Sequence, residues 1–296
     1  MRADVRALAL PVLAALLPVS HASAQRGSIS APVLRARALR NGAPVKMFVP
    51  SGTVQIIGWD RDSLVIRGRL PASTQLLLGG SDTTGYKLTM DARDDALPAP
   101  VQLAVYLPRR SQLALKTADA TTEVRDVGGW FYTVSGRYRF AGTMSSLDAE
   151  AMSGDLDLEA TTPWARARTG RGHLVIGGAP DDVDASTIGG ALDVEASSIR
   201  RGRFTSVTGD IHYAAAMREG SLFELSTHSG AIELLLPRDV SAHLDLSSLE
   251  GEIDDGFVKL HPANRGGHSL QLRLGTASAE VTVRTFKGTV RVRARQ

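Results

Sequence analysis

The segment AMSGDLDL, residues 151–158, decides the fold of this chain because variants of it recur along most of the sequence. In each copy a glycine stands between two runs in which apolar and polar residues alternate. The copies are centred on Gly136, Gly154, Gly172, Gly190, Gly209, Gly230 and Gly251, at spacings of 18, 18, 18, 19, 21 and 21 residues. Such a regular internal period predicts a fold made of stacked copies of one unit.

The alternation assigns one side of each run to the core. The second and fourth residues after the glycine are apolar in nearly every copy, as in Leu156 and Leu158. The seventh, fifth and third residues before it are small or apolar, as in Leu147, Ala149 and Ala151. Because successive side chains of a strand point to opposite faces, these five positions define one buried face.

The third residue before the glycine is nearly always a hydroxyl residue or alanine. The residues at this position are Thr117, Thr133, Ala151, Thr169, Thr187, Ser206, Thr227, Ser248 and Thr285. We interpret them as an inward ladder beside the turn, where the walls converge and only a small side chain fits. The glycine is expected to supply a backbone conformation that other residues adopt only at a cost.

The repeat extends beyond these copies. Gly52 and Gly288 fit the same template, and residues 107–124 resemble residues 236–253 after a shared Leu-Pro-Arg. Longer strand pairs near residues 85–106 and 256–275 interrupt the period. We expect these excursions to cap the ends of the stack, where unpaired strand edges would otherwise be exposed.

The repeat predicts an all-β protein. Two strands per copy cannot bury their own apolar face, but consecutive coils that stack share one core. The sequence therefore predicts a single β-solenoid domain over residues 45–296, after a lead-in at residues 25–44. The alternative is an antiparallel meander, barrel or sandwich in which each glycine closes a hairpin. The constant coil length and the small position favour the solenoid.

The first residues predict export. Arg2 and Arg6 precede an apolar run at residues 7–19, and residues 22–24 read Ala-Ser-Ala. This pattern is typical of a secretion signal peptide over residues 1–24, and the run is shorter than the ~20 residues of a membrane-spanning helix. We expect a soluble mature protein in the periplasm or outside the cell. The chain has no cysteine, which excludes disulfides and a cysteine nucleophile, and its net charge of +3 does not favour nucleic acid as a partner.

The chain also resembles a known family. The resemblance rests on GTVQIIGWDRDSLVIRG at residues 52–68, on the Leu-Pro-Arg strand ends and on the repeated Ser-Gly turns. Over roughly residues 40–296 these features resemble the bacterial putative-adhesin family of β-strand-repeat domains, a secreted or envelope-associated group of unknown function. The resemblance implies a β-solenoid and brings no catalytic residues. In this context residues 59–62, Trp-Asp-Arg-Asp, are interpreted as a corner in which Asp60 and Asp62 bond turn amides, rather than as a cation or sugar site.

One outward column contains candidate metal ligands. Asp193, His212 and Glu233 occupy the third position after successive glycines, so a stack would place them on consecutive rungs ~4.8 Å apart. Carboxylates and imidazole are ligands for divalent cations. The alternative is a solvated charged face in which neighbouring arginines relieve the repulsion.

A second outward feature combines aromatic and basic residues. The template points Trp130, Tyr132, Arg137 and Arg139 outward. Exposed rings beside guanidinium groups could bind sugars or an anionic polysaccharide. The alternative is that a loop or a partner covers these rings.

No catalytic motif accompanies these features. The sequence lacks G-x-S-x-G, H-E-x-x-H and a phosphate-binding loop. We therefore predict a non-enzymatic envelope or extracellular module without a cofactor, which binds a cell-surface glycan or an envelope protein or acts as a scaffold. The alternatives are a polysaccharide-active enzyme of β-helical fold and a self-assembling structural protein.

Overall fold

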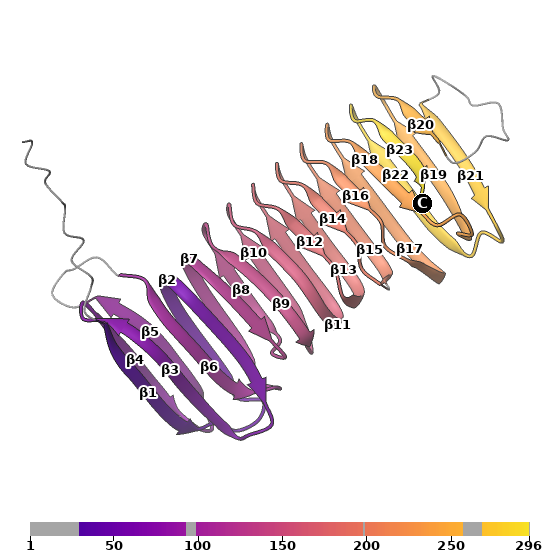
Figure 1. Ribbon diagram of the computed structural model, residues 1–296. Helices are drawn as coiled ribbons and strands as arrows, with labels where there is room; N and C mark the ends of the chain where they lie inside the picture. The colour runs from indigo at the N-terminus through magenta and orange to yellow at the C-terminus, as the bar shows by residue number, and fades with distance from the viewer. Residues whose placement is uncertain (1–29, 93–98, 198, 257–267, 296) are drawn as a thin grey trace, which may run out of the picture.

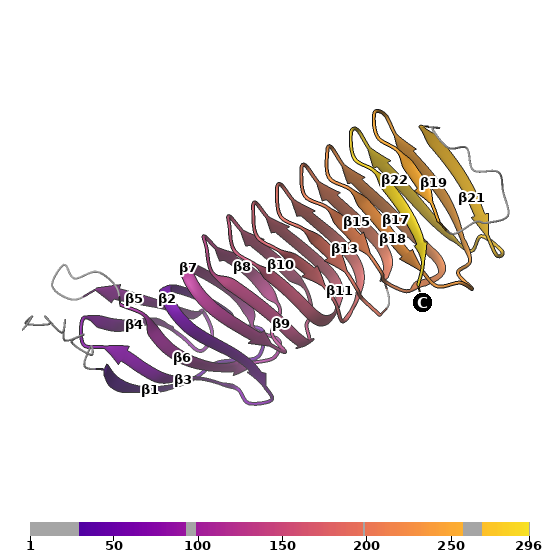
Figure 2. The same cartoon turned by 45° about the horizontal axis from the view of Figure 1, so that its top comes forward.

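The computed structural model describes residues 30–92, 99–197, 199–256 and 268–295, and these residues form an all-β body. The strands are stacked one beside the next along the length of the molecule, as Figures 1 and 2 show. The expected signal peptide, residues 1–24, lies outside the described residues. No helix in the described part of the chain is long and apolar enough to cross a membrane.

The strands follow one another along the chain with short connections. They are β1 (Ser30–Ala38), β2 (Pro44–Trp59), β3 (Ser63–Pro71), β4 (Thr74–Ser81), β5 (Gly85–Ala92), β6 (Val101–Pro108), β7 (Gln112–Arg125), β8 (Gly129–Thr133), β9 (Arg137–Thr143), β10 (Leu147–Ala151), β11 (Leu156–Thr169), β12 (Leu174–Ile176), β13 (Ala179–Thr187), β14 (Leu192–Val194), β15 (Ile199–Ser206), β16 (Ile211–Tyr213), β17 (Met217–Thr227), β18 (Ile232–Leu236), β19 (Ala242–Ser248), β20 (Ile253–Asp255), β21 (Ser269–Leu274), β22 (Ala279–Thr285) and β23 (Val290–Ala294).

Each coil contributes one strand to each of two parallel ladders. In the first, ladder A, Ala149 of β10 pairs with Phe131 of β8 and with Ala167 of β11. In the second, ladder B, Leu158 of β11 pairs with Phe140 of β9 and with Ile176 of β12. The runs on either side of a turn glycine thus belong to different ladders. The antiparallel hairpin of the alternative prediction is not formed at these glycines.

The core lies between the two ladders and contains the predicted inward residues. Leu147, Ala149, Ala151, Leu156 and Leu158 are all buried. The inward assignment from the alternation is therefore confirmed. Aromatic side chains in the core form two groups: Phe131, Tyr138 and Phe140, then Phe204, Tyr213 and Phe223.

The turn glycines are needed for close approach rather than for an unusual backbone angle. A Cβ at Gly154 would lie 1.9 Å from the carbonyl oxygen of Gly136, and one at Gly190 would lie 1.8 Å from that of Gly172. The column continues through Gly209, Gly230, Gly288 and Gly251. None of the glycines from Gly136 onward in this column has a positive φ, so the expected special conformation is wrong for them. Each rung leaves no room for a Cβ.

The hydroxyl residues beside these glycines are buried and also close the turns. The Oγ1 of Thr133 and of Thr187 accepts the backbone N–H of the glycine three residues later, at 3.0 Å in both cases. Equivalent bonds are made by Thr169, Thr227, Ser248 and Thr285. The small inward position predicted from the sequence therefore also satisfies a buried donor.

The spatial order of the coils departs from the sequence order at both ends. β22 and β23, the last coil, lie between β17 and β18 on one side and β19 and β20 on the other (Figure 1). At the other end β2 lies between β7 and the pair β5 and β6. The expectation that consecutive coils stack is wrong at these two places. Beyond them, antiparallel pairing begins: β3 with β6, β1 with β3, β4 with β5, and β21 with β19.

The duplicated Leu-Pro-Arg segments mark the two crossings over an inserted coil. Leu107 and Leu236 are buried at the ends of β6 and β18. The carbonyl of the following proline, Pro108 or Pro237, then accepts the N–H three residues later, that of Ser111 or Val240. After this turn the chain passes the inserted coil and continues as β7 or β19. The duplication in the sequence therefore corresponds to a repeated change of position in the stack.

The glycine column can be tested with two adjacent residues. Gly190→Ala should destabilise the protein by about 2–4 kcal/mol, because its Cβ would overlap the Gly172 carbonyl. Gly189→Ala is the matched control, since its Cβ would meet nothing closer than 3.5 Å. Urea unfolding of both variants measures the difference. Equal midpoints for the two variants would show that the close approach does not limit this position.

Candidate functional site

The two ladders present two long outer faces, and along part of each face charges of opposite sign lie on neighbouring rungs. On face A, the outer side of ladder A, Arg166 lies 3.7 Å from Asp148 and 4.0 Å from Asp184, on the two neighbouring rungs. Further along, Arg203 pairs with Glu224 at 3.1 Å. From β10 to β17 the positive and negative side chains of this face largely balance each other.

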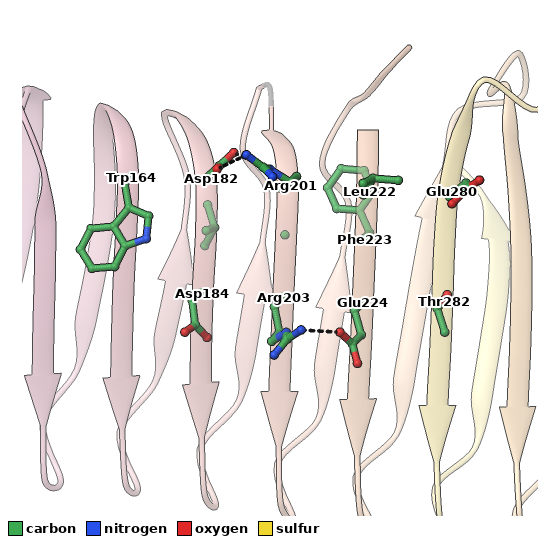
Figure 3. A pocket seen from close by; sticks show the side chains of 12 residues that line it. Trp164, Asp182, Asp184, Arg201, Arg203, Leu222, Phe223, Glu224, Glu280 and Thr282 are labelled. Carbon is green, nitrogen blue, oxygen red and sulfur yellow. Dashed lines mark hydrogen bonds and ion pairs between the residues drawn. The ribbon is translucent and has the colours of Figure 1, made fainter. Parts of the chain in front are cut away.

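A hollow of about 440 Å³ on this part of face A shows the same balance (Figure 3). Trp164 lines one end, and the middle holds Asp182 beside Arg201 and Arg203 beside Glu224. The guanidinium groups are thus engaged by carboxylates of adjacent strands. This hollow presents paired charges to a ligand.

The four aromatic and basic candidates fall on opposite outer faces. Trp130 and Tyr132 lie on β8, in ladder A, whereas Arg137 and Arg139 lie on β9, in ladder B. Arg137 pairs with Asp155 at 2.7 Å and Arg139 with Asp157 at 3.5 Å. The structure therefore does not bring the arginines to the aromatic rings, because the turn at Gly136 carries the chain from one ladder to the other.

The basic residues that lie near Trp130 are lysines from other strands of ladder A. Across the rungs of ladder A, Lys87 pairs in register with Lys46, Lys46 with Ala114, and Ala114 with Trp130. In the neighbouring outward column Phe48 is followed by Lys116 and Tyr132. We call the six residues Lys46, Phe48, Lys87, Lys116, Trp130 and Tyr132 the Trp130 patch. The three lysines are exposed, and none forms an ion pair with any described residue.

The aromatic rings of the patch support one another. The Trp130 and Tyr132 rings are stacked, with centroids 6.1 Å apart and planes 12° apart. The Lys116 Nζ lies 5.2 Å from the centroid of the Trp130 ring, within the range of a cation–π contact. Both rings remain partly exposed. These contacts fix the orientation of the Trp130 indole before any ligand arrives.

A hollow of about 670 Å³ lies beside Trp130. Its lining includes Lys46, Arg110 and Trp130, together with Ser111, Ser145 and Ser146 and no carboxylate. Gly128 and Gly129 also line the hollow. Sequence reasoning missed Lys46, although the template places it six residues before Gly52, as Trp130 lies six residues before Gly136.

The three candidate metal ligands lie on consecutive rungs of face B, the outer side of ladder B, as their spacing predicted. Asp193 pairs in register with His212, and His212 with Glu233. Their side chains form separate pairs, because His173 Nε2 lies 2.6 Å from Asp193 Oδ2 while His212 Nδ1 lies 3.4 Å from Glu233 Oε2. Within the described residues, no three histidine or acidic side chains are grouped so that they could hold a metal ion.

The Trp-Asp-Arg-Asp segment forms the corner between β2 and β3, as interpreted from the sequence. The Trp59 indole donates to the Ser63 carbonyl at 2.9 Å and packs 5.2 Å from the Tyr106 ring. The Asp60 carboxylate, however, accepts a bond from Arg109 Nε at 3.1 Å rather than from a turn amide. Trp59 and Asp60 thus serve the structure of this corner.

Arg109 connects this corner to the next coil. The Arg109 Nη1 lies 2.8 Å from Asp126 Oδ2, and Asp126 Oδ1 accepts the Thr143 N–H at 2.9 Å. Burial alone would raise the pKa of Asp126, but the Thr143 N–H and the Arg109 guanidinium outweigh it, so the pKa is lowered. Asp126 therefore stabilises the fold in its charged form.

Comparison with known proteins identifies the fold. No protein-family model matches the chain, and no curated protein matches it in sequence. A structure described as that of a putative adhesin from Parabacteroides distasonis matches with a TM-score of 0.51 at 10% identity, covering 89% of this chain and 97% of the other. One from Parabacteroides merdae, also described as a putative adhesin, matches with a TM-score of 0.50 at 11% identity, covering 88% and 96%. The resemblance stated from the sequence is therefore confirmed at the level of the fold.

The pairing on face B predicts how the protein responds to metal ions. Because His173 and Glu233 already engage Asp193 and His212, adding calcium or zinc, or a chelator, should leave the unfolding temperature unchanged. Differential scanning fluorimetry of the wild type checks this. A rise in that temperature with either ion, abolished by Asp193→Asn, would contradict the prediction.

The Arg109–Asp126 pair predicts an acid-dependent loss of stability. Because the pKa of Asp126 is lower in the folded protein, its contribution is present above the unfolded value of about 3.9 and disappears as the pH falls through the folded value. Asp126→Asn keeps an oxygen for the Thr143 N–H but loses the charge. The variant should therefore be less stable than the wild type at about pH 7, and the difference should shrink towards about pH 2. Urea unfolding measures it, and a difference independent of pH would contradict this role of the charge.

Proposed function

We propose that this chain is an exported, non-enzymatic β-solenoid that acts as an adhesin-like binding module, and that its ligand binds at the Trp130 patch. The observation that carries the proposal is the distribution of charge on face A. Arginines and carboxylates pair across the rungs from β10 to β17, whereas Lys46, Lys87 and Lys116 have no acidic partner among the described residues. Unpaired cations beside exposed aromatic rings are available to a ligand.

The parallel pairing supports the solenoid part of the proposal. Residues one repeat apart, such as Asp148 and Arg166, are neighbours in ladder A, and Asp157 and Val175 are neighbours in ladder B. Stacking of this kind lets one core run through all the coils, so we treat residues 45–296 as one domain. The basic and apolar start of the sequence supports export.

The pKa shifts of two ion-paired carboxylates agree with a non-enzymatic role. Side-chain hydrogen bonds from Arg218, the larger effect, and from Arg200 lower the pKa of the Asp181 carboxyl. Burial would raise the pKa of Asp155, but the His173 N–H and the Arg137 guanidinium together lower it. A polysaccharide-cleaving enzyme needs a carboxylic acid whose pKa is raised, so that it can donate a proton. These carboxylates are shifted in the opposite direction.

Assembly end to end has less support than ligand binding. A polymer of coils would need parallel strand edges free at both ends of the stack. Here the antiparallel strands β3 and β21 lie against β6 and β19. Strands of this kind interrupt a continuous parallel ladder.

The proposal is tested by binding to isolated bacterial envelope fractions. We expect the mature chain to bind, and the triple variant Lys46→Gln, Lys87→Gln, Lys116→Gln to lose most of that binding. The matched control, Arg166→Gln, Arg168→Gln, Arg203→Gln, removes the same number of charges from the paired part of face A and should bind like the wild type. Equal loss in both variants, or no loss in either, would overturn the assignment of the ligand to the patch.

A further inference from the structure

We infer that the hollow beside Trp130 is a subsite for an acidic sugar, a pyranose ring bearing a carboxylate within a linear anionic polysaccharide. The inference rests on the proposed function and names the ligand class of the same surface. The hollow measures about 670 Å³, within the range of roughly 300–1,000 Å³ that small-molecule sites occupy.

The lining supplies the parts that such a sugar requires. The Trp130 indole forms one wall, and the apolar face of a sugar ring stacks on an aromatic ring. Tyr132 and Lys116 contact Trp130 but do not line the hollow, so they hold the indole in place from outside it. The wall is therefore preorganised, which reduces the entropy lost on binding.

The charge of the hollow selects an anion. Lys46 and Arg110 line it, and neither forms an ion pair with any described residue. The hollow at Trp164 differs, because its lining contains Asp182, Asp184, Glu224 and Glu280 beside Arg201 and Arg203. Since both hollows lie on face A and each contains a tryptophan, their difference in charge predicts that a carboxylated sugar binds only beside Trp130.

Polar groups around the hollow match sugar hydroxyls. Ser111, Ser145 and Ser146 line it, and the Oγ of the buried Ser111 has no hydrogen-bond partner in the described structure. The Ser111 Oγ is itself shielded from solvent, so the hydroxyls that a sugar would meet in the hollow are those of Ser145 and Ser146.

The lysines extend the subsite along the stack. Lys87 follows Lys46 on the adjacent strand, one rung of ~4.8 Å further from Trp130. A polymer that carries a carboxylate on each sugar would place further charges along this column. Single-stranded nucleic acid is favoured less, because its recognition uses several aromatic side chains that stack successive bases, whereas only one aromatic ring lines this hollow.

The test measures binding of the mature chain to polygalacturonate oligosaccharides by calorimetry. We expect binding, and little or none to dextran oligosaccharides of equal length. Trp130→Ala and Lys46→Gln should each weaken it about tenfold, the effect of losing ~1.4 kcal/mol. Trp164→Ala is the matched control and should bind like the wild type. Lys46 is exposed, so Lys46→Gln tests the site even if Trp130→Ala unfolds.

The outcomes separate this inference from the proposed function. If polygalacturonate does not bind while envelope binding still depends on the three lysines, the acidic-sugar inference is overturned and the proposed function stands. If Trp164→Ala weakens polygalacturonate binding as much as Trp130→Ala, the location of the subsite is overturned. If oligo-dT binds as tightly as polygalacturonate and competes with it, the ligand class is overturned in favour of nucleic acid.

Discussion

The close approach of consecutive coils at the glycine turns is the constraint on which the rest of the structure depends. At each turn the backbone of one rung lies directly on the carbonyl of the rung before it, as Gly190 lies on Gly172, and any Cβ would separate them. The hydroxyl three residues earlier then accepts the glycine N–H, so that the turn is satisfied internally. Because this contact recurs in each coil, it keeps all the strands in one register, and the register in turn aligns every side chain with its equivalents in other coils.

Because the side chains are aligned in register, electrostatic repulsion between neighbouring rungs affects each outer face. Like charges in one column would stand ~4.8 Å apart and repel each other. The chain avoids this by alternating sign, as Asp148, Arg166 and Asp184 do on face A. On face B, histidines take some of the positions between carboxylates. Asp193 therefore pairs with His173, and His212 pairs with Glu233, so these side chains do not form a metal site. The columns that contain Lys46, Lys87 and Lys116 do not follow this alternation, so their charges are available to a ligand.

Much of the fold was predictable from the sequence because a period of two residues determines which side chains face the core. The burial of Leu156 and Leu158 and the hydroxyl position at Thr187 follow from that period alone. The reason for the glycines could not be deduced, since a turn that needs a positive φ and a turn that needs close approach have the same sequence. The separation of Trp130 from Arg137 was missed because a short spacing in sequence does not show that the turn between them changes ladders.

The position of β2 is what creates the candidate site. In a stack that followed sequence order, the coil of β2 would have the antiparallel excursion of β3 and β4 on its downstream side. Because the chain crosses over β2 at Leu107, Pro108 and Arg109, β2 instead has β5 on one side and β7 on the other. Lys46 is thereby placed beside Lys87, and only one strand, β7, lies between it and the strand that carries Trp130. The same crossing contributes Arg110 and Ser111 to the hollow and directs Arg109 towards Asp60 and Asp126. The irregular end of the repeat therefore brings together cations, hydroxyls and an aromatic wall that regular stacking would keep apart.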